Sequence, residues 1–183
     1  VFPWGRFPGF AVVLGPEMQS TGEVMGIDPD PAIAFAKSQV SAFNPLPTEG
    51  KVFISVNDRD KERVLHMARQ LADMGFTLCA TRGTMIHLLQ HDIECERAYK
   101  VNEARRPNIV DHIKNGDIDF IINTPGSHDA RADDIIIRSS AIAAKTSYCT
   151  NLASAQACVN AIEALKNKNL QVCTIQEYHA QNL

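Results

Sequence analysis

The sequence predicts an α/β fold in which a mostly parallel sheet is sandwiched between helices. After residue 50, short apolar segments of strand length alternate with segments of helix length. One apolar segment, Asp119 to Asn123 (DFIIN), shows no alternation of polar and apolar residues, as expected for a strand covered on both faces. Strands that alternate with helices in this way are typical of parallel sheets. A three-layer, Rossmann-type architecture follows.

The first fifty residues differ from the rest. Residues 1–27 hold half of the ten glycines and are expected to be rich in turns. Asp30 followed by Pro31 is typical of a helix N-cap and first helical residue, which predicts a short helix through Val40. Residues 44–50 contain two prolines and a glycine and are predicted to be a linker. Because the chain begins at Val1 and changes character here, we expect a piece of a longer polypeptide with a domain boundary at this linker.

Residues 51–74 form the first predicted strand and helix. The run from Lys51 to Val56 (KVFISV) is short and apolar, which favours a strand. In residues 60–74, apolar side chains recur at helical spacing along one stripe: Val64, Leu65, Ala68, Leu71 and Ala72. Gly75 is placed to end this helix.

The remaining segments continue the alternation. Further strands are predicted at residues 76–80, 98–101, 119–123, 146–149 and 171–175, followed by a polar tail. Further helices are predicted at residues 84–91, 108–115, 132–144 and 151–166. Gly116 is placed to end the helix at 108–115, and Asn151 to cap the last one.

Composition and charge exclude several classes of function. The formal net charge of the 183 residues is −3 and the basic residues lie among acidic ones, so we exclude nucleic acid and membranes as partners. The chain shows no signal-peptide pattern, and its five cysteines include no C-x-x-C pair, so we expect reduced thiols and a cytoplasmic location. His87 and His91 have a metal-compatible spacing, but the sequence offers no evident third ligand, so no metal site is predicted.

Polar residues follow four successive predicted strands, where parallel sheets bind ligands. Thr81 and Thr84 offer hydroxyls at a helix N-terminus, and Lys61 and Lys100 offer positive charge, which together suit a phosphate monoester. Each residue also has a structural alternative, because threonines cap helices and lysines are common on surfaces. Phosphate binding is favoured over these structural roles only if the four residues lie together at one end of the sheet. The sequence contains neither G-x-x-x-x-G-K-[ST] nor G-x-G-x-x-G.

Several segments resemble one family: FPWGRFPG, LGPEMQSTGEVMGID, DKERVLHMARQLADMGFTLCATRGT, IKNGDIDFIINTPG, IIIRSSAIAAK and IQEYHAQ. They resemble the methylglyoxal-synthase-like domain in the form that closes the large subunit of carbamoyl phosphate synthase. The resemblance implies that residues 1–43 are the end of the second ATP-grasp synthetic unit and that residues 51–183 form the allosteric domain. Residues 44–50 are the linker between them. It implies a regulatory, non-catalytic part of an ATP-dependent, glutamine-hydrolysing ligase.

The resemblance also implies a set of binding residues for UMP, an inhibitor, and IMP, an activator. The implied phosphate ligands are Lys61, Thr81, Thr84 and Lys100, and the implied ribose and base contacts are Val101, Asn123, Thr124 and Asp133. Leu14, Tyr148 and Thr150 match part of an ornithine site. Pro125, Asp134 and Cys149 stand where the family has threonine, serine and aspartate, so the choice and sign of the effector stay open.

The implied partners are the nucleotide effectors, the upstream synthetic domains and the small glutaminase subunit, with self-association left open. No cofactor is expected for this piece; the full enzyme is expected to use ATP with Mg or Mn, for pyrimidine and arginine biosynthesis.

A stand-alone methylglyoxal synthase acting on dihydroxyacetone phosphate is one alternative, but it needs a carboxylate base, and Glu103 is the only nearby candidate. A structural module with a vestigial pocket is the other alternative.

Overall fold

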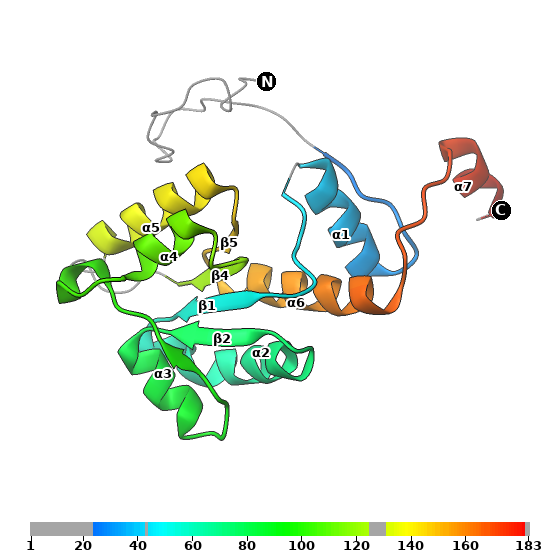
Figure 1. The fold of residues 1–183 in the computed structure, drawn as a ribbon. Helices are drawn as coiled ribbons and strands as arrows, with labels where there is room; N and C mark the ends of the chain where they lie inside the picture. The colour runs from blue at the N-terminus through cyan, green and yellow to red at the C-terminus, as the bar shows by residue number, and fades with distance from the viewer. Residues whose placement is uncertain (1–23, 43, 125–130, 182–183) are drawn as a thin grey trace.

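The sheet of the computed structural model, which describes residues 24–42, 44–124 and 131–181, is five-stranded and parallel throughout. The strand order is β3-β2-β1-β4-β5 (Figure 1). The strands are β1 Lys51–Ser55, β2 Thr77–Ala80, β3 Glu96–Arg97, β4 Phe120–Asn123 and β5 Ser147–Cys149. The order reverses between β1 and β4, which is where open parallel sheets bind ligands at their carboxyl ends. The predicted fold class is confirmed.

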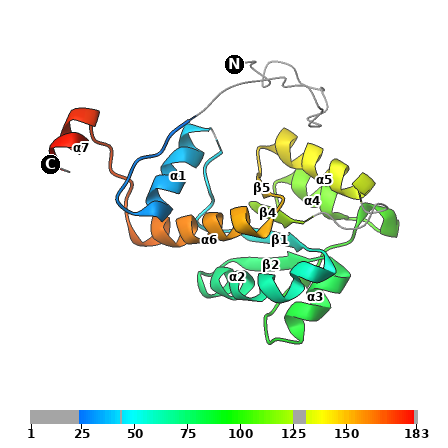
Figure 2. The same ribbon diagram turned by 180° about the vertical axis from the view of Figure 1, so that it is seen from behind.

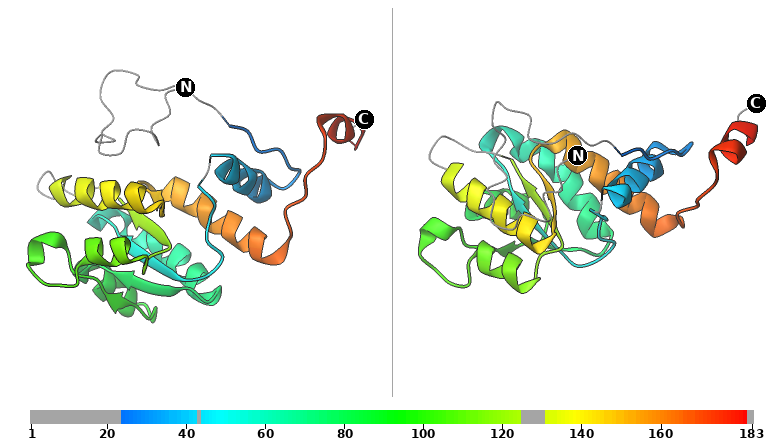
Figure 3. Two further views of the ribbon diagram at one scale, coloured as in Figure 1. Left: turned by 45° about the horizontal axis from the view of Figure 1, so that its top comes forward. Right: turned by 90° about the horizontal axis from the view of Figure 1, so that it is seen from above.

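Helices cover both faces of the sheet (Figures 1 and 2). The view from above separates α4 and α5 on one side from α2 and α6 on the other (Figure 3). Helix α1 packs on α6, whereas α7 lies apart at the C-terminal end. The helices of the described residues are α1 Pro31–Ser41, α2 Lys61–Asp73, α3 Arg82–Leu89, α4 Ile109–Asn115, α5 Arg131–Ala144, α6 Leu152–Asn167 and α7 Ile175–Gln181, with 3-10 turns η2 Asp58–Asp60 and η3 Val101–Glu103.

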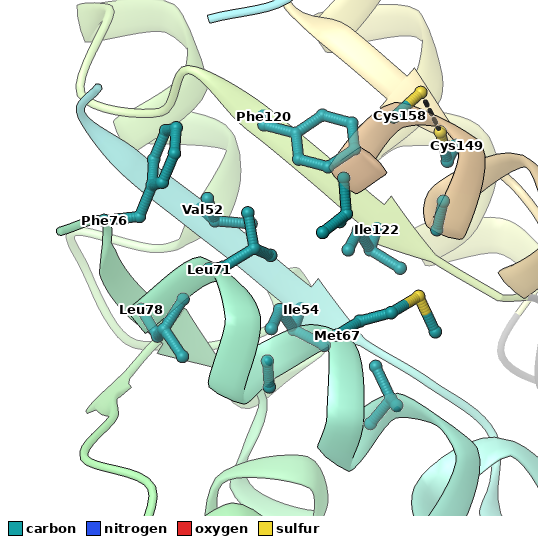
Figure 4. Close-up of a cluster of buried hydrophobic side chains, with 14 of the residues drawn as sticks. Val52, Ile54, Met67, Leu71, Phe76, Leu78, Phe120, Ile122, Cys149 and Cys158 are labelled. Atoms are coloured by element: carbon teal, nitrogen blue, oxygen red, sulfur yellow. Dashed lines mark hydrogen bonds between the residues drawn. The ribbon is translucent and has the colours of Figure 1, made fainter. Parts of the chain in front are cut away.

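The two faces of the sheet form two hydrophobic cores. Val52 and Ile54 pack with α2 and α6, while Phe53 between them packs with α4 and α5. All three side chains are fully buried. Figure 4 shows the first core, in which Phe120 and Ile122 of β4 lie beside Val52 and Ile54. Burial on both faces explains why these strands are continuous apolar runs.

Local capping contacts confirm the predicted helix ends. The Asp30 carboxylate accepts a hydrogen bond from the Ala32 amide at 3.0 Å, and the Asn151 side chain accepts one from the Ser154 amide at 2.8 Å. Gly116 ends α4 with a φ of +77°, a conformation that glycine adopts without steric cost. These helices therefore begin and end where the sequence predicts, within one or two residues.

The strand predicted at residues 98–101 is wrong in position. The edge strand β3 is Glu96–Arg97, and residues 101–103 form the turn η3. The Ala98 amide still bonds to the carbonyl of Ala80 at 2.8 Å, but the carbonyl of Tyr99 accepts from the amide of Ile109. The chain thus leaves the sheet to enter α4.

The strand predicted at residues 171–175 is also wrong. This segment pairs with no described strand, and Val172 is 96% exposed. The helix α7 follows instead, begun by a reciprocal cap in which Thr174 and Glu177 each bond to the other's backbone amide. The spacing Thr-x-x-Glu is the sequence signal for this helix start. In the described part of the chain, no helix is long and apolar enough to cross a membrane.

Candidate functional site

The carboxyl ends of the three central strands meet at one edge of the sheet. The Thr81 amide, just after β2, donates to the carbonyl of Ile54 at 3.3 Å. The Thr124 amide, just after β4, donates to the carbonyl of Ser55 at 3.0 Å. Thr81 and Thr124, two of the predicted site residues, are therefore held on either side of the end of β1. This is the position expected of ligand-binding residues, because parallel sheets bind ligands at the carboxyl ends of their strands.

Two predicted threonines lie together at the N-terminus of α3. Thr81 Oγ1 is 3.4 Å from both Thr84 Oγ1 and Ser55 Oγ. Thr84 Oγ1 also accepts a hydrogen bond from the Val56 amide at 3.3 Å. The Thr81 side chain makes no capping bond to α3, although Thr81 occupies the N-cap position. In the part of the chain that the structure describes, the first amides of α3 thus receive no cap from the Thr81 side chain, which favours an anion there.

The Lys61 ammonium group lies over the start of α3. A Cβ atom added to Gly83 would be 3.5 Å from Lys61 Nζ, which shows how near the lysine comes to this backbone. Lys61 Nζ also forms a 2.7 Å ion pair with Asp58, and this hydrogen bond lowers the pKa of the Asp58 carboxyl group. Lys61, Thr81 and Thr84 are therefore brought together around Gly83.

Lys100 lies after the edge strand β3, on the approach to η3. Its amide donates to Glu103 Oε1 at 3.3 Å, while Arg97 holds the other oxygen of Glu103 at 2.7 Å. The Lys100 ammonium group has no ion pair with any residue that the structure describes. The structure therefore places Lys100 near the same carboxyl end of the sheet, but its ammonium group makes no contact that connects it to Thr81 or Thr84. Val101 begins η3 and is half-buried.

The end of β4 forms a second polar group. Asn123 Nδ2 donates to Asp134 Oδ1 at 3.0 Å and to the Tyr148 hydroxyl at 3.1 Å. The Arg138 guanidinium lies 5.9 Å from the centre of the Tyr148 ring. Asp134 therefore points inward, toward the sheet edge. Three buried oxygens of this group lack a hydrogen-bond partner among the described residues: Asn123 Oδ1, Asp133 Oδ2 and Asp134 Oδ2.

Thr124 connects the two polar groups. Its hydroxyl oxygen accepts hydrogen bonds from the amide of Asn57 at 3.0 Å and from the Asn57 side chain at 3.1 Å. Asn57 in turn caps the turn η2, which leads into Lys61. Thr124 thus fixes the loop after β1 against the end of β4. Sequence reasoning did not single out Asn57, although an asparagine before a short helix is a recognised capping signal.

The residues matched to an ornithine site are only partly described, because Leu14 lies outside the described residues. Tyr148 bonds to Asn123, and Thr150 is half-buried after β5. Cys149 points into the core, where its sulfur lies 3.4 Å from that of Cys158 (Figure 4). The contact with Cys158 and burial raise the pKa of the Cys149 thiol, so this position supplies no negative charge.

Comparison with known proteins gives a consistent set of similarities. Residues 63–150 match the family model described as MGS-like domain. The chain is 49% identical over 180 residues to the "Carbamoyl phosphate synthase large chain, C-terminal section" of Methanopyrus kandleri, covering 98% of this chain and 33% of that protein. It is 46% identical over 183 residues to the carbamoyl phosphate synthase large chain of Archaeoglobus fulgidus, covering 100% of this chain and 17% of that protein.

Among solved structures, methylglyoxal synthase from Elizabethkingia anophelis is similar to the chain with a TM-score of 0.50 and 17% identity. The match covers 62% of this chain and 79% of that chain. At this identity the likeness shows the fold alone. The chain spans a third of the length of the Methanopyrus relative and less of the Archaeoglobus one.

Proposed function

The chain belongs to the carbamoyl phosphate synthase large-chain family, whose C-terminal section it matches, and from this we propose that it is the regulatory, effector-binding domain of such an enzyme. The proposed whole enzyme is a glutamine-hydrolysing, ATP-dependent ligase that makes carbamoyl phosphate for pyrimidine and arginine biosynthesis. Its ATP sites lie in the upstream synthetic domains, and the small glutaminase subunit is its proposed partner. In this piece, residues 51–183 bind the effector.

The proposed effector is a nucleoside monophosphate such as UMP or IMP, with its phosphate at the N-terminus of α3. One observation carries this proposal: the Lys61 ammonium group lies beside Gly83, at a helix start that the side chain of its N-cap residue, Thr81, does not cap. The first backbone amides of α3 and the positive end of the helix dipole favour an anion there. The Thr81 and Thr84 hydroxyls lie at the same helix start and are the proposed donors to the phosphate oxygens, and Lys100, which follows the edge strand β3, is the proposed second positive charge.

The ribose and base are proposed to lie toward β4, against Val101, Asn123, Thr124 and Asp133. Asn123 is 2% exposed, and its Oδ1 has no partner in the described part of the chain. A buried carbonyl oxygen without a partner costs about 1–3 kcal/mol, so a hydroxyl or amine donor from the ligand is stabilised there. A nucleotide that spans from α3 to β4 supplies both the anion and such donors.

Regulation requires that effector binding changes the conformational balance of the synthetic units, and this coupling must be reciprocal. The N-terminal segment contacts the effector domain directly. Lys168 after α6 forms a 2.8 Å ion pair with Asp30, and Lys166 donates to the carbonyl of Thr48 at 2.8 Å. We propose that residues 1–43 end the preceding synthetic unit and that the linker 44–50 transmits movement through these contacts.

Titration calorimetry with UMP and IMP tests the proposed function. Uridine, which keeps the base and ribose but lacks the phosphate, is the matched control ligand. We expect saturable binding of at least one nucleotide and much weaker binding of uridine, because the phosphate contacts carry the charge-assisted hydrogen bonds. Absence of binding for both nucleotides would favour the alternative of a structural module with a vestigial pocket.

A stand-alone methylglyoxal synthase is disfavoured by the contacts of its candidate base. The two carboxylate oxygens of Glu103 bond to Arg97 and to the amide of Lys100. A general base must be free to accept a proton from the substrate. Incubation with dihydroxyacetone phosphate is expected to yield no methylglyoxal above the uncatalysed rate; an enzymatic rate would overturn the regulatory proposal.

Asp134→Asn is expected to strengthen UMP binding roughly two- to tenfold, because it removes a negative charge beside Asn123, the proposed ribose and base contact, and so reduces the repulsion of the bound nucleotide's phosphate. Asparagine keeps the side-chain oxygen that accepts from Asn123. Calorimetry of both variants measures the change, with Asp73→Asn on the exposed end of α2 as the control. Unchanged or weaker binding by Asp134→Asn alone would place the phosphate away from this carboxylate.

A further inference from the structure

Three side chains with metal-binding atoms meet between α2 and α3, on the side of the sheet where these helices lie side by side (Figures 1 and 2). Glu62 lies in the first turn of α2, His87 lies on α3 and His91 follows α3. One ligand atom of each lies within 4.8 Å of the others. His87 Nε2 and a Glu62 carboxylate oxygen are 3.3 Å apart.

The packing of α3 fixes the positions of the two histidines. Their spacing of four residues places the rings on one face, with centroids 4.7 Å apart. Leu88, adjacent to His87, is fully buried in the same core cluster as Val64 of α2. Because this leucine anchors α3 against α2, His87 is directed toward the first turn of α2, where Glu62 lies.

The hydrogen bonding of both rings suits metal binding. His91 Nδ1 lies 2.9 Å from the carbonyl oxygen of His87. When Nδ1–H donates to that carbonyl, the lone pair of Nε2 is free, which is the arrangement common among metal-bound histidines. His87 Nε2 is buried and makes no hydrogen bond to a described residue, because the 3.3 Å approach of the Glu62 carboxylate lacks hydrogen-bond geometry. Each ring thus has a nitrogen that can bind a cation.

We propose that Glu62, His87 and His91 form a binding site for a divalent transition metal ion, with Zn²⁺ as the best fit. Two imidazoles and one carboxylate suit Zn²⁺, whereas Mg²⁺ and Ca²⁺ take oxygen ligands. Tetrahedral ligands at Zn distances of about 2.0–2.1 Å lie roughly 3.3 Å from one another, as His87 and Glu62 already do. The Glu62 side chain is 74% exposed, so it can rotate to complete the site, and water can take the fourth position.

The metal would connect the first turn of α2 to α3. Glu62 directly follows Lys61, whose ammonium group lies over the start of α3. A bound ion would therefore hold the turn that carries Lys61 in place. The metal site itself does not depend on the proposed nucleotide site, and its test contains no nucleotide.

Titration of the 183-residue chain with Zn²⁺ by calorimetry, and with Co²⁺ by visible absorption, tests the proposal. We expect one site per chain, with the intense visible bands of four-coordinate Co²⁺ and no near-ultraviolet band from a cysteine ligand. Glu62→Gln and His91→Gln are expected to weaken Zn²⁺ binding roughly tenfold or more, since a ligand should matter at least as much as its supporting contacts. His179→Gln, an exposed histidine on α7, is the matched control.

Circular dichroism establishes that the variants are folded; Glu62 is mostly exposed, so its substitution leaves the core intact. Equal Zn²⁺ affinity in Glu62→Gln, His91→Gln and His179→Gln would overturn the proposal. So would the weak spectrum of six-coordinate Co²⁺, a thiolate band, or the absence of any Zn²⁺ binding to the unsubstituted chain.

Discussion

The Lys100→Ala variant is expected to bind UMP and IMP about 10- to 150-fold more weakly, which corresponds to roughly 1.5–3 kcal/mol for a charge-assisted phosphate contact. Both nucleotides should lose affinity alike, because they share the phosphate and differ in the base. The substitution leaves the local backbone in place, since the contact of Lys100 with Glu103 is made by the backbone amide. Calorimetry with each nucleotide measures the effect.

Lys114→Ala is the control for this prediction. Lys114 lies in the last turn of α4, which leads into the start of β4 at the opposite edge of the sheet. We expect its removal to leave nucleotide affinity unchanged. If Lys100→Ala binds both nucleotides as tightly as Lys114→Ala does, Lys100 is not part of the effector site.

The Phe120→Ala variant is expected to lose about 3–5 kcal/mol of unfolding free energy, the usual cost of removing a buried aromatic ring. Phe120 is fully buried and packs in the core that joins β1 and β4 to α2 and α6 (Figure 4). Because β1 and β4 flank the proposed site, weaker packing of these strands is also expected to reduce the affinity for the effector. Urea denaturation followed by circular dichroism measures the unfolding free energy.

Val172→Ala provides the comparison, because Val172 is 96% exposed and lies outside both cores. A surface substitution of this kind is expected to change the free energy by less than about 0.5 kcal/mol. Similar losses in Phe120→Ala and Val172→Ala would contradict the assignment of the core.

The interior of the sheet could be predicted from the sequence because two independent signals agree there. The apolar runs of β1 and β4 contain no polar alternation, and both strands are covered on both faces. Helices α4 and α6 begin at asparagine caps that the sequence displays. The apolar pattern and the capping residues were sufficient to predict these strands and helices because tertiary packing favours the same structure there.

The prediction failed where strand formation depended on a neighbour. Residues 171–175 have the composition of a strand but pair with no described strand. The edge strand β3 is only two residues long because the chain turns away to supply η3 and α4. A short apolar run joins a sheet only where a neighbouring strand has an unpaired edge beside it. The spacing of apolar residues along the chain does not show whether such an edge is present.

For the candidate site, the expectation that ligand-binding residues follow the ends of parallel strands predicted where Thr81 and Thr124 lie, but it did not predict which atoms they contact or that the Lys100 ammonium group is not joined to the two threonines. Thr81 and Thr124 lie on either side of the end of β1, as expected. The inward direction of Asp134 and the contacts that occupy Glu103 depend on side chains from other elements. The same holds for Glu62, which lies 25 residues before His87 in the chain and is the missing third ligand for the histidine pair.

Amide chemical shifts during a titration with UMP test the central claim most directly. If the phosphate binds at the start of α3, the largest shifts should fall on the amides of Arg82, Gly83 and Thr84, with further shifts near Asn123. Largest shifts confined to the apolar groove lined by Met25, Val40, Val172 and Tyr178, with the start of α3 unchanged, would contradict an effector site at the strand ends.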